Sequence, residues 1–250
     1  MTPKLHDKIA LVTGGSSGIG FAAAQRFVAE GAHVFITGRR QAELDAAVKR
    51  MGSNVTGVLG DVSKLEDLDR LYATVGKQKG RLDVLFANAG GGSLMPLGHI
   101  TEEHFDKTFG TNVRGLLFTV QKALPLMPKG SSIVLNASMT SIKGMPAFSV
   151  YSATKAAVRS FARGWSVDLK DRGIRVNAIS PGVVPTAGYD LLGLTKEQVQ
   201  GFVDAQAQSI PLGRVGTTEE IARAVVFLAC EDSSYVNGVE LFVDGGLGQV

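Results

Sequence analysis

Four polar side chains have types and positions suited to handling a ligand. Tyr151 and Lys155 are four positions apart, and in a helix this spacing places both on one face. Ser138 lies just past a predicted strand at 132–137, and ligands of open α/β sheets bind at the carboxyl ends of strands. Asn112 lies inside a predicted helix, where asparagine has a low helix propensity, so its presence indicates a specific role. A Tyr–Lys pair alone is weak evidence, because surface pairs of this kind are common.

A glycine-rich turn, Thr13-Gly14-Gly15-Ser16-Ser17-Gly18-Ile19-Gly20, follows the first predicted strand and opens the first predicted helix. Such a turn lets the backbone approach a pyrophosphate and points amide N–H groups at its oxygens. Alone it could be a structural turn, but its place between strand and helix favours a dinucleotide site. No Lys-Ser/Thr follows the last glycine, which excludes a phosphate-transfer loop. The expected contacts are Gly14, Ser16, Ser17, Gly18, Ile19 and Gly20.

The end of the second predicted strand carries Arg39 and Arg40 and no acidic residue. NAD sites place an Asp or Glu there to hold the ribose hydroxyls. A carboxylate would repel a 2′-phosphate, whereas arginine offers a planar fork for bidentate phosphate contact. We therefore predict NADP(H) as the preferred cofactor, with NAD(H) as the alternative. The competing interpretation is that both arginines are solvated charges at a helix start.

Apolar strand-like runs alternate with helical patterns along the whole chain, as in a parallel sheet covered on both faces. The predicted strands are 8–13, 33–37, 55–59, 82–87, 132–137, 174–179 and 239–243, and the predicted helices are 19–30, 41–51, 64–77, 102–126, 150–172 and 218–229. This pattern indicates an α/β fold: a single doubly wound, Rossmann-type parallel seven-stranded sheet. The least regular stretch, 185–213, is predicted to be a mobile substrate loop.

Length and the absence of a linker or composition shift indicate one soluble domain over 1–250. The placement of the motifs divides it into an expected cofactor half of about 1–130 and an expected catalytic and substrate half of about 131–250. Of 250 residues, 44% are hydrophobic and 20% charged, which excludes a disordered chain. The net charge of +3 is scattered, which disfavours nucleic acid as a partner. The single cysteine, Cys230, is expected to be a buried small hydrophobe. No apolar run approaches the ~18 residues of a membrane span, and no secretory signal is evident, so we expect a cytoplasmic protein without membrane partners.

Together these motifs resemble the short-chain dehydrogenase/reductase (SDR) family, in its subgroup of about 250 residues. The matching elements run in the family's order over essentially the whole chain: 13–20, Asn88-Ala89-Gly90, Asn112, Ser138, Tyr151 with Lys155, and Pro181-Gly182. Two small departures stand out. Ala87 replaces an asparagine found in many members, and Ser16 and Ser17 stand where some NADP-preferring members carry a basic residue.

The resemblance implies a role for each polar side chain. Tyr151 would be the general acid in reduction and the general base in oxidation, its pKa of about 10 lowered by Lys155 and the oxidised nicotinamide. Lys155 would also hold the nicotinamide ribose, and Ser138 would donate to the substrate oxygen. Asn112 would hold, through its main chain, a water that relays protons. Hydride would pass directly between nicotinamide and substrate, so no metal is expected, and the four histidines show no zinc-type spacing.

The resemblance also implies further cofactor contacts. Asp61, followed by Val62, would meet the adenine amino group, and the competing interpretation is a plain surface acid. Asn88, Ala89 and Gly90 would line the adenine ribose. The segment after the sixth strand would hold the nicotinamide carboxamide, unless its Pro-Gly pair is only a turn; its expected contacts are Pro181, Gly182, Val184 and Thr186.

The segments that set substrate choice in the family are moderately apolar here. They supply Leu94, Met95, Ile142, Met145, Phe148, Tyr189, Leu191 and Leu192, with Lys143 the one ionised group before Asp190. We predict a small-molecule ketone or secondary alcohol, although such a cluster can be plain packing. The alternatives are a 3-oxoacyl-carrier-protein reductase, a glucose-type sugar dehydrogenase and a non-catalytic dinucleotide-binding scaffold. The resemblance further implies a homotetramer, in which Val158, Phe161 and Trp165 could be core or interface.

Overall fold

The computed structural model describes residues 3–186 and 195–250, which form one parallel sheet between two helical layers. Its seven strands run in the order β3-β2-β1-β4-β5-β6-β7, and every neighbouring pair is parallel. The strands are β1 (Ile9–Thr13), β2 (His33–Gly38), β3 (Val55–Leu59), β4 (Val84–Ala87), β5 (Ser132–Asn136), β6 (Arg175–Pro181) and β7 (Glu240–Val243). The predicted α/β fold is confirmed, with strand ends that differ by at most two residues.

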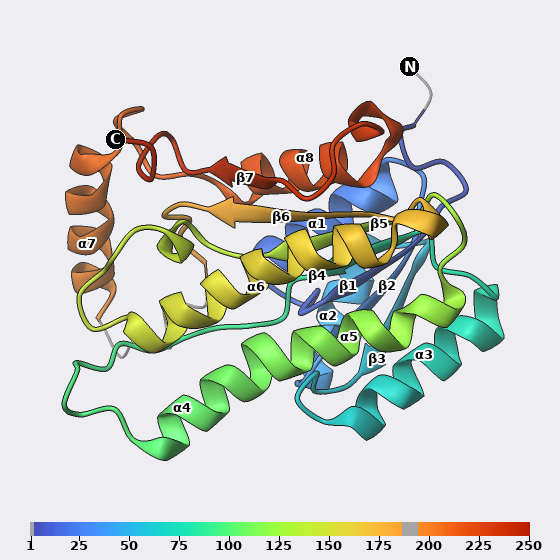
Figure 1. Ribbon diagram of the computed structural model, residues 1–250, viewed down its shortest axis with the longest axis horizontal. Coiled ribbons are helices and arrows are strands. Elements are labelled where there is room, and N and C mark those ends of the chain that lie inside the picture. The colour runs from blue at the N-terminus through green and yellow to red at the C-terminus, as the bar shows by residue number, and fades with distance from the viewer. Residues whose placement is uncertain (1–2, 187–194) are drawn as a thin grey trace.

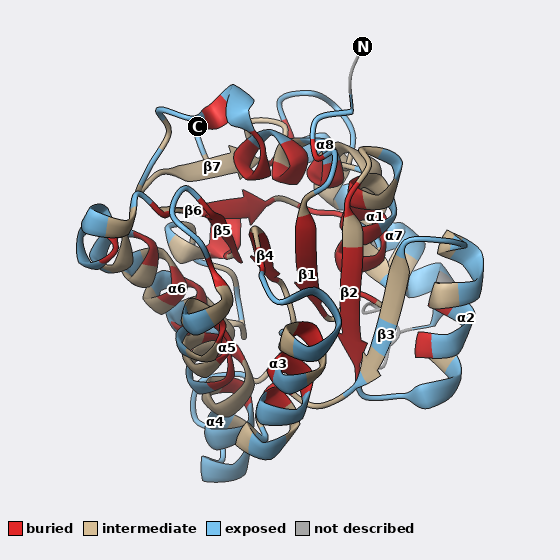
Figure 2. Cartoon of the chain, turned by 90° about the vertical axis from the view of Figure 1, so that its right-hand side faces the viewer, coloured by how far each residue is buried: buried red, intermediate tan, exposed pale blue. Residues whose placement is uncertain are grey.

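Helices cover both faces of the sheet (Figures 1 and 2). One face carries α1 (Gly18–Ala29), α2 (Gln41–Met51) and α8 (Thr218–Ala229), and the other carries α3 (Leu65–Lys79), α5 (Leu116–Ala123) and α6 (Ser149–Asp168). Each layer has its own hydrophobic core against the sheet, and Cys230 is buried in the first, as expected. Strands buried on two sides explain why the sequence shows continuous apolar runs rather than alternation. Among the described residues, no helix has the length and apolarity to cross a membrane.

Two regions differ from the sequence prediction. The single helix expected over 102–126 is broken into α4 (Glu102–Phe109), a π-helical turn (Gly110–Gly115), α5 and a 3₁₀ turn (Leu124–Leu126). The stretch 185–213 is not irregular throughout, because it contains α7 (Lys196–Ser209). Thr195 begins this helix with a capping box, in which its hydroxyl accepts from the Gln198 amide and Gln198 returns a bond, a local signal that stabilises a helix start.

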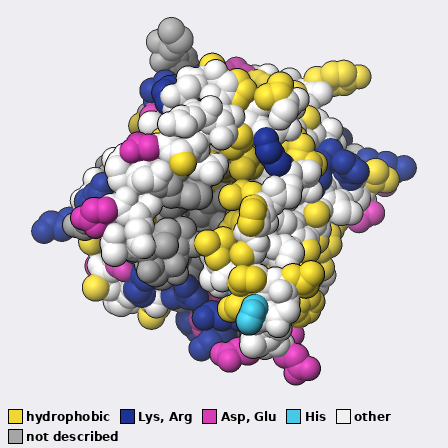
Figure 3. Space-filling view, turned by 90° about the vertical axis from the view of Figure 1, so that its left-hand side faces the viewer, with side chains coloured by type: hydrophobic (Ala, Val, Ile, Leu, Met, Phe, Trp, Pro, Cys, Tyr) yellow, Lys and Arg dark blue, Asp and Glu magenta, His cyan; other side chains and the backbone are white. Residues whose placement is uncertain are grey.

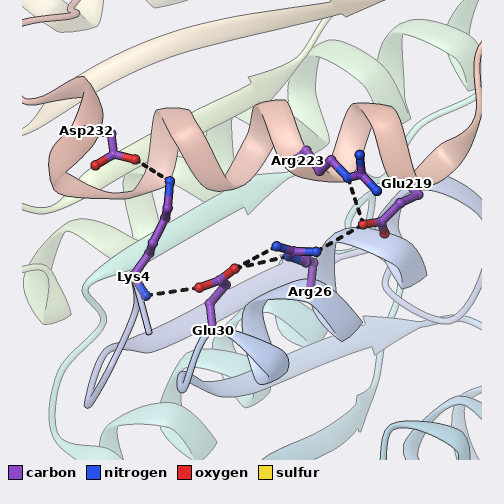
Figure 4. Close-up of polar contacts among 6 residues, drawn as sticks. All are labelled: Lys4, Arg26, Glu30, Glu219, Arg223 and Asp232. Carbon is purple, nitrogen blue, oxygen red and sulfur yellow. Dashed lines mark hydrogen bonds and ion pairs between the residues drawn. The ribbon is translucent and has the colours of Figure 1, made fainter. Parts of the chain in front are cut away.

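Ion pairs join α1 to α8 on the outer surface of the first layer (Figure 4). Arg26 on α1 contacts both Glu30 and Glu219, and Glu219 also contacts Arg223 on α8. Lys4 extends the chain of charges, because its backbone amide donates to Glu30 and its ammonium pairs with Asp232. We call these six residues the α1–α8 ion chain.

Candidate active site

The carboxyl ends of the parallel strands meet at one edge of the molecule, and the loops that follow them carry many of the predicted site residues. The glycine turn follows β1, Arg39 follows β2, Asn88-Ala89-Gly90 follows β4, Ser138 follows β5 and Gly182 follows β6. Figure 3 views this edge, where hydrophobic side chains gather. A parallel sheet is what brings together segments that are far apart in sequence.

The turn between β1 and α1 is shaped by its glycines. Gly14 and Gly18 have φ values of +65° and +55°, which glycine adopts without strain. A Cβ on Gly20 would lie 2.2 Å from the Gly14 carbonyl oxygen, so only hydrogen fits there. Ser17 begins α1 without a side-chain capping bond, and the first turn has no acidic residue. The amides of this helix start therefore suit an anionic ligand, and the turn fits the pyrophosphate of a dinucleotide.

A chain of amide hydrogen bonds connects the glycine turn to β5. Asn88 donates from Nδ2 to the backbone oxygen of Thr13 at 2.9 Å, and it accepts from Nδ2 of Asn136 at 2.9 Å. The Thr13 hydroxyl accepts from the amides of Asn88 and Ala89, both at 3.0 Å. These bonds fix the loop after β4 against the glycine turn. The predicted Asn88 motif therefore stabilises the sheet, in addition to its expected contact with the cofactor.

Tyr151 and Lys155 lie one turn apart on α6, as their spacing predicts. Lys155 is buried and donates from Nζ to the backbone oxygen of Asn136 at 2.6 Å, while Nζ lies 5.4 Å from the centre of the Tyr151 ring. Burial lowers the pKa of Lys155 to about 8. An ammonium has three donors, so Lys155 can bind a ligand hydroxyl and keep this bond. The Tyr151 ring also stacks on Phe148, with centroids 4.3 Å apart.

Ser138 begins the 3₁₀ turn Met139–Ser141 directly after β5. Its Oγ accepts hydrogen bonds from the amide and the hydroxyl of Thr140, at 3.2 and 3.1 Å. A hydroxyl that accepts two bonds still has its own hydrogen to donate. The turn therefore presents a donor that can face a substrate oxygen.

Asn112 is buried within the π-helical turn Gly110–Gly115. Its Nδ2 donates to the Gly91 oxygen at 2.9 Å and to Thr154 Oγ1 at 3.0 Å, and its Oδ1 accepts from the Gly91 amide at 3.0 Å. The side chain thus ties this helix to the loop after β4 and to α6. A π turn inside a helix is frequently found at functional sites. The water relay expected from the main chain of Asn112 stays a prediction.

Arg39 and Arg40 differ in their surroundings, although both are exposed. Arg39 Nη1 lies 3.9 Å from Asp61 Oδ2, so its guanidinium spans the ends of β2 and β3. Arg40 pairs instead with Glu43 inside its own helix. Ser16 reaches the same corner as Arg39, since a Cβ on the last residue of β2 would lie 2.8 Å from Ser16 Oγ. Ser16 and Arg39, two expected phosphate contacts, therefore lie at the same corner as Asp61, the expected adenine contact. Arg40 instead forms a local ion pair.

The segment after β6 is packed rather than a free turn. The Gly182 amide donates to the Val243 oxygen at 3.0 Å, and a Cβ on Gly182 would lie 2.6 Å from the Asp244 Cα. Thr186 reaches the glycine turn, because a Cβ on Gly18 would lie 3.3 Å from Thr186 Cγ2. The other expected cofactor residues also lie near this edge: Val62 and Val184 are buried, Ile19 is half-buried, and Gly90 is next to Asn112 and Lys155.

The apolar residues expected to contact a substrate differ in their exposure. Leu94 and Ile142 are large exposed hydrophobic residues, and Met145 is half-buried. Lys143, the cation expected in this region, donates to the backbone oxygen of Leu247 near the chain end. Its charge is therefore engaged by the C-terminal segment. The expected substrate residues Tyr189, Leu191 and Leu192 lie outside the described residues.

Sequence reasoning missed two residues of this site. Asn136 offers its backbone oxygen to Lys155 and its amide to Asn88. Thr154 accepts from Asn112 and donates to the backbone oxygen of Tyr151 at 2.6 Å. The available signal was a polar residue at a position that the strand or helix pattern requires to be buried, since such groups are almost always hydrogen-bonded.

Three comparisons agree with this architecture. A family model described as "Enoyl-(Acyl carrier protein) reductase" matches residues 14–248. The chain is 49% identical to "Oxidoreductase asL5" of Sarocladium schorii, over 99% of this chain and 98% of that one. It is 38% identical to "Glucose 1-dehydrogenase" of Gluconobacter oxydans, over 96% and 91%. A crystal structure described as a short-chain dehydrogenase/reductase, glucose/ribitol dehydrogenase, from Brucella melitensis superimposes with a TM-score of 0.92 at 30% identity, covering 99% of both chains.

These matches extend from the glycine turn to the last strand and cover nearly the whole of each relative. The residues matched in the relatives include all seven strands of the sheet and the edge at which the predicted side chains converge. The chain therefore belongs to the short-chain dehydrogenase/reductase family and is an oxidoreductase that acts on CH–OH or C=O groups.

Proposed function

We propose that the protein is an NADP(H)-dependent oxidoreductase that interconverts a moderately apolar ketone and its secondary alcohol, with Tyr151 as the general acid and base. The observation that carries this proposal is the buried Lys155 beside the Tyr151 ring, at the same sheet edge as the Ser138 hydroxyl and the glycine turn.

Each side chain has a defined task in this reaction. Tyr151 donates its phenolic proton to the substrate oxygen in reduction and takes it back in oxidation. Lys155 favours the phenolate by its charge and binds the nicotinamide ribose. Ser138 donates a hydrogen bond to the same substrate oxygen as negative charge develops on it. When bound, the nicotinamide supplies or accepts the hydride.

The proposed preference for NADP(H) rests mainly on Arg39. Arg39→Ala should lower the ratio of kcat/KM for NADPH to that for NADH by about ten- to a hundredfold, the size of a lost hydrogen bond to a charged group. Arg40→Ala is the matched control, because Arg40 pairs within its own helix and should change the ratio much less. A wild-type enzyme that prefers NADH would refute the assignment.

The proposed substrate is uncharged, since the side chains expected to contact it are apolar and Lys143 is engaged by the C-terminal segment. The names of the family model and of one relative suggest two alternative substrates. One is a thioester linked to a carrier protein, and the other is a sugar, as for the glucose dehydrogenase. A panel of ketones, ketoesters, sugars and acyl thioesters, followed by loss of NADPH absorbance, separates the three. Highest kcat/KM for the sugars or thioesters would reject the apolar ketone.

The decisive test of the mechanism is Tyr151→Phe. The variant should bind NADPH with unchanged affinity but lose at least a thousandfold in kcat, because the proton donor is gone. Cofactor titration and turnover with the best substrate of the panel give both numbers. Full activity in this variant would refute the mechanism, and loss of NADPH binding would show that the tyrosine serves the cofactor instead.

The proposal includes a cytoplasmic homotetramer with no nucleic-acid or membrane partner. Val158 is buried in the core, whereas Phe161 and Trp165 form a half-buried stack with centroids 4.5 Å apart, and Val167 on the same helix is 64% exposed. Light scattering after gel filtration measures the mass directly, and a dimer or monomer would correct this part. A non-catalytic scaffold, the other alternative, predicts no turnover with any compound in the panel.

A further inference from the structure

The carboxylate of Glu240, at the start of β7, is nearly buried and has partners on three other elements. Its Oε1 accepts from the hydroxyls of Ser141 and Ser180, both at 2.6 Å. Its Oε2 lies 3.1 Å from Nε of Arg159, and the two side chains are 7% and 16% exposed. Arg159 is held further by a bond from Nη1 to the Gly238 oxygen at 2.9 Å. A buried charge is tolerated only with such partners.

Each partner of Glu240 belongs to an element that carries the proposed chemistry. Arg159 lies on α6 one turn after Lys155, on the same helix face. Ser141 closes the turn that begins at Ser138, because its amide donates to the Ser138 oxygen at 2.9 Å. Ser180 lies near the end of β6, two residues before the Gly182 segment. Among the described residues, this one carboxylate joins the Ser138 turn to the helix of Tyr151 and to the sheet.

We propose that Glu240 is a positioning residue, which holds the Ser138 turn in register with the catalytic helix through Ser141 and Arg159. This inference rests on the proposed function, because it gives Glu240 its effect through the hydroxyl of Ser138. Met139 of the turn packs in a small hydrophobic cluster with Val183 and Leu247. Among the described residues, the bonds of the Ser138 hydroxyl run only to Thr140, and the bond from Ser141 to Glu240 is a polar contact that ties the turn to α6 and β7. Displacement of a hydrogen-bond donor by less than 1 Å is enough to weaken its action on a developing charge.

The test is a comparison of Ser141→Ala in two backgrounds. In the wild-type background this change should lower kcat about tenfold, with the NADPH dissociation constant changed less than twofold. In the Ser138→Ala background it should have no further effect on kcat, because the hydroxyl being positioned is absent. Ser141→Thr keeps the hydroxyl and should retain kcat within about twofold. Glu240→Ala should lower kcat at least as much as Ser141→Ala, and the double variant no further than Glu240→Ala alone.

Glu219→Gln is the matched control, since it removes a carboxylate that also contacts an arginine, but on the α1–α8 ion chain; its kcat should equal that of the wild type. If Glu240→Ala does not fold, Ser141→Ala, which removes a single hydroxyl, carries the test alone. Equal losses of kcat from Ser141→Ala in both backgrounds would overturn the inference and leave the proposed function intact. Full activity of Ser138→Ala would overturn the inference together with the proposed role of Ser138.

Discussion

Two sets of polar residues hold this molecule together in different ways. The α1–α8 ion chain is largely exposed, with Arg26 at 38% and Arg223 at 67% (Figure 4). At the carboxyl edge, Asn112, Lys155 and Glu240 are instead buried or nearly so. The first set joins two helices at the surface through mostly exposed charged side chains, whereas the second set joins segments of the site through buried or nearly buried side chains.

The difference is one of environment rather than of chemical type. An exposed ion pair contributes little, because water and salt screen it and two long side chains must be ordered. A buried polar group costs stability unless every bond is made, and removing one partner leaves the others unsatisfied. We therefore expect changes at the carboxyl edge to be large and tied to activity, and changes in the ion chain to be small and dependent on salt.

The largest loss of stability is expected for Asn112→Ala. This change removes Asn112 as the partner of both polar groups of Gly91, which water can reach, and of the buried hydroxyl of Thr154, at a cost of about 1–3 kcal/mol in the free energy of unfolding. Urea unfolding measures it, with Gln121→Ala, an exposed amide on α5, as the control that should lose under about 1 kcal/mol. Equal losses in the two variants would show that the buried amide of Asn112 contributes no more to stability than an exposed one.

The pH dependence of stability separates Lys155 from the exposed charges, because burial of its charged form opposes folding. Burial lowers its pKa from 10.5 to about 8, so between these values the unfolded chain holds a proton that the folded chain has released. Stability from this residue therefore rises as pH increases through 8 to 10.5 and is lowest below pH 8.

Lys155→Met should accordingly be more stable than the wild type at pH 7, by about 3 kcal/mol, and this advantage should shrink as pH approaches 10.5. Urea unfolding of both proteins at pH 7 and pH 10 gives the difference, in which other titrating groups cancel. An advantage that is the same at both pH values would contradict the assigned burial effect. In the proposed function, the ammonium of Lys155 serves the reaction, which gives this cost a purpose.

The smallest effect is expected in the ion chain. Glu219→Gln removes the carboxylate between Arg26 and Arg223 and should lower the free energy of unfolding by less than about 1 kcal/mol at low salt. The difference should vanish at about 1 M salt, where the screening length falls to about 3 Å. Unfolding curves at both salt concentrations check this, and a loss above 2 kcal/mol that persists in salt would remove the distinction between the two sets.

Much of the fold was predictable because its signals are local. The Gln41–Met51 and Thr218–Ala229 helices coincide with the predicted bounds, and α8 begins with a capping box between Thr217 and Glu220. The break between α4 and α5 was not predictable, since the residues of the π turn read as continuous helix. Buried bonds from Asn112 to Gly91 and Thr154 accompany the turn there, and these depend on tertiary packing. The capping box of α7 at Thr195 was present in the sequence and was overlooked.

By itself, the sequence determined the strand–helix alternation, the glycine turn and the Tyr151–Lys155 spacing, because these depend on periodicity and on backbone freedom within a few residues. Only the tertiary structure decided that Asn136 would meet Lys155, that Arg39 and Arg40 would have different partners, and that Glu240 would join the Ser138 turn to α6. The physical reason is that these contacts join segments that follow different strands or lie on different helices. The ends of the parallel strands meet in space although they are far apart in the chain.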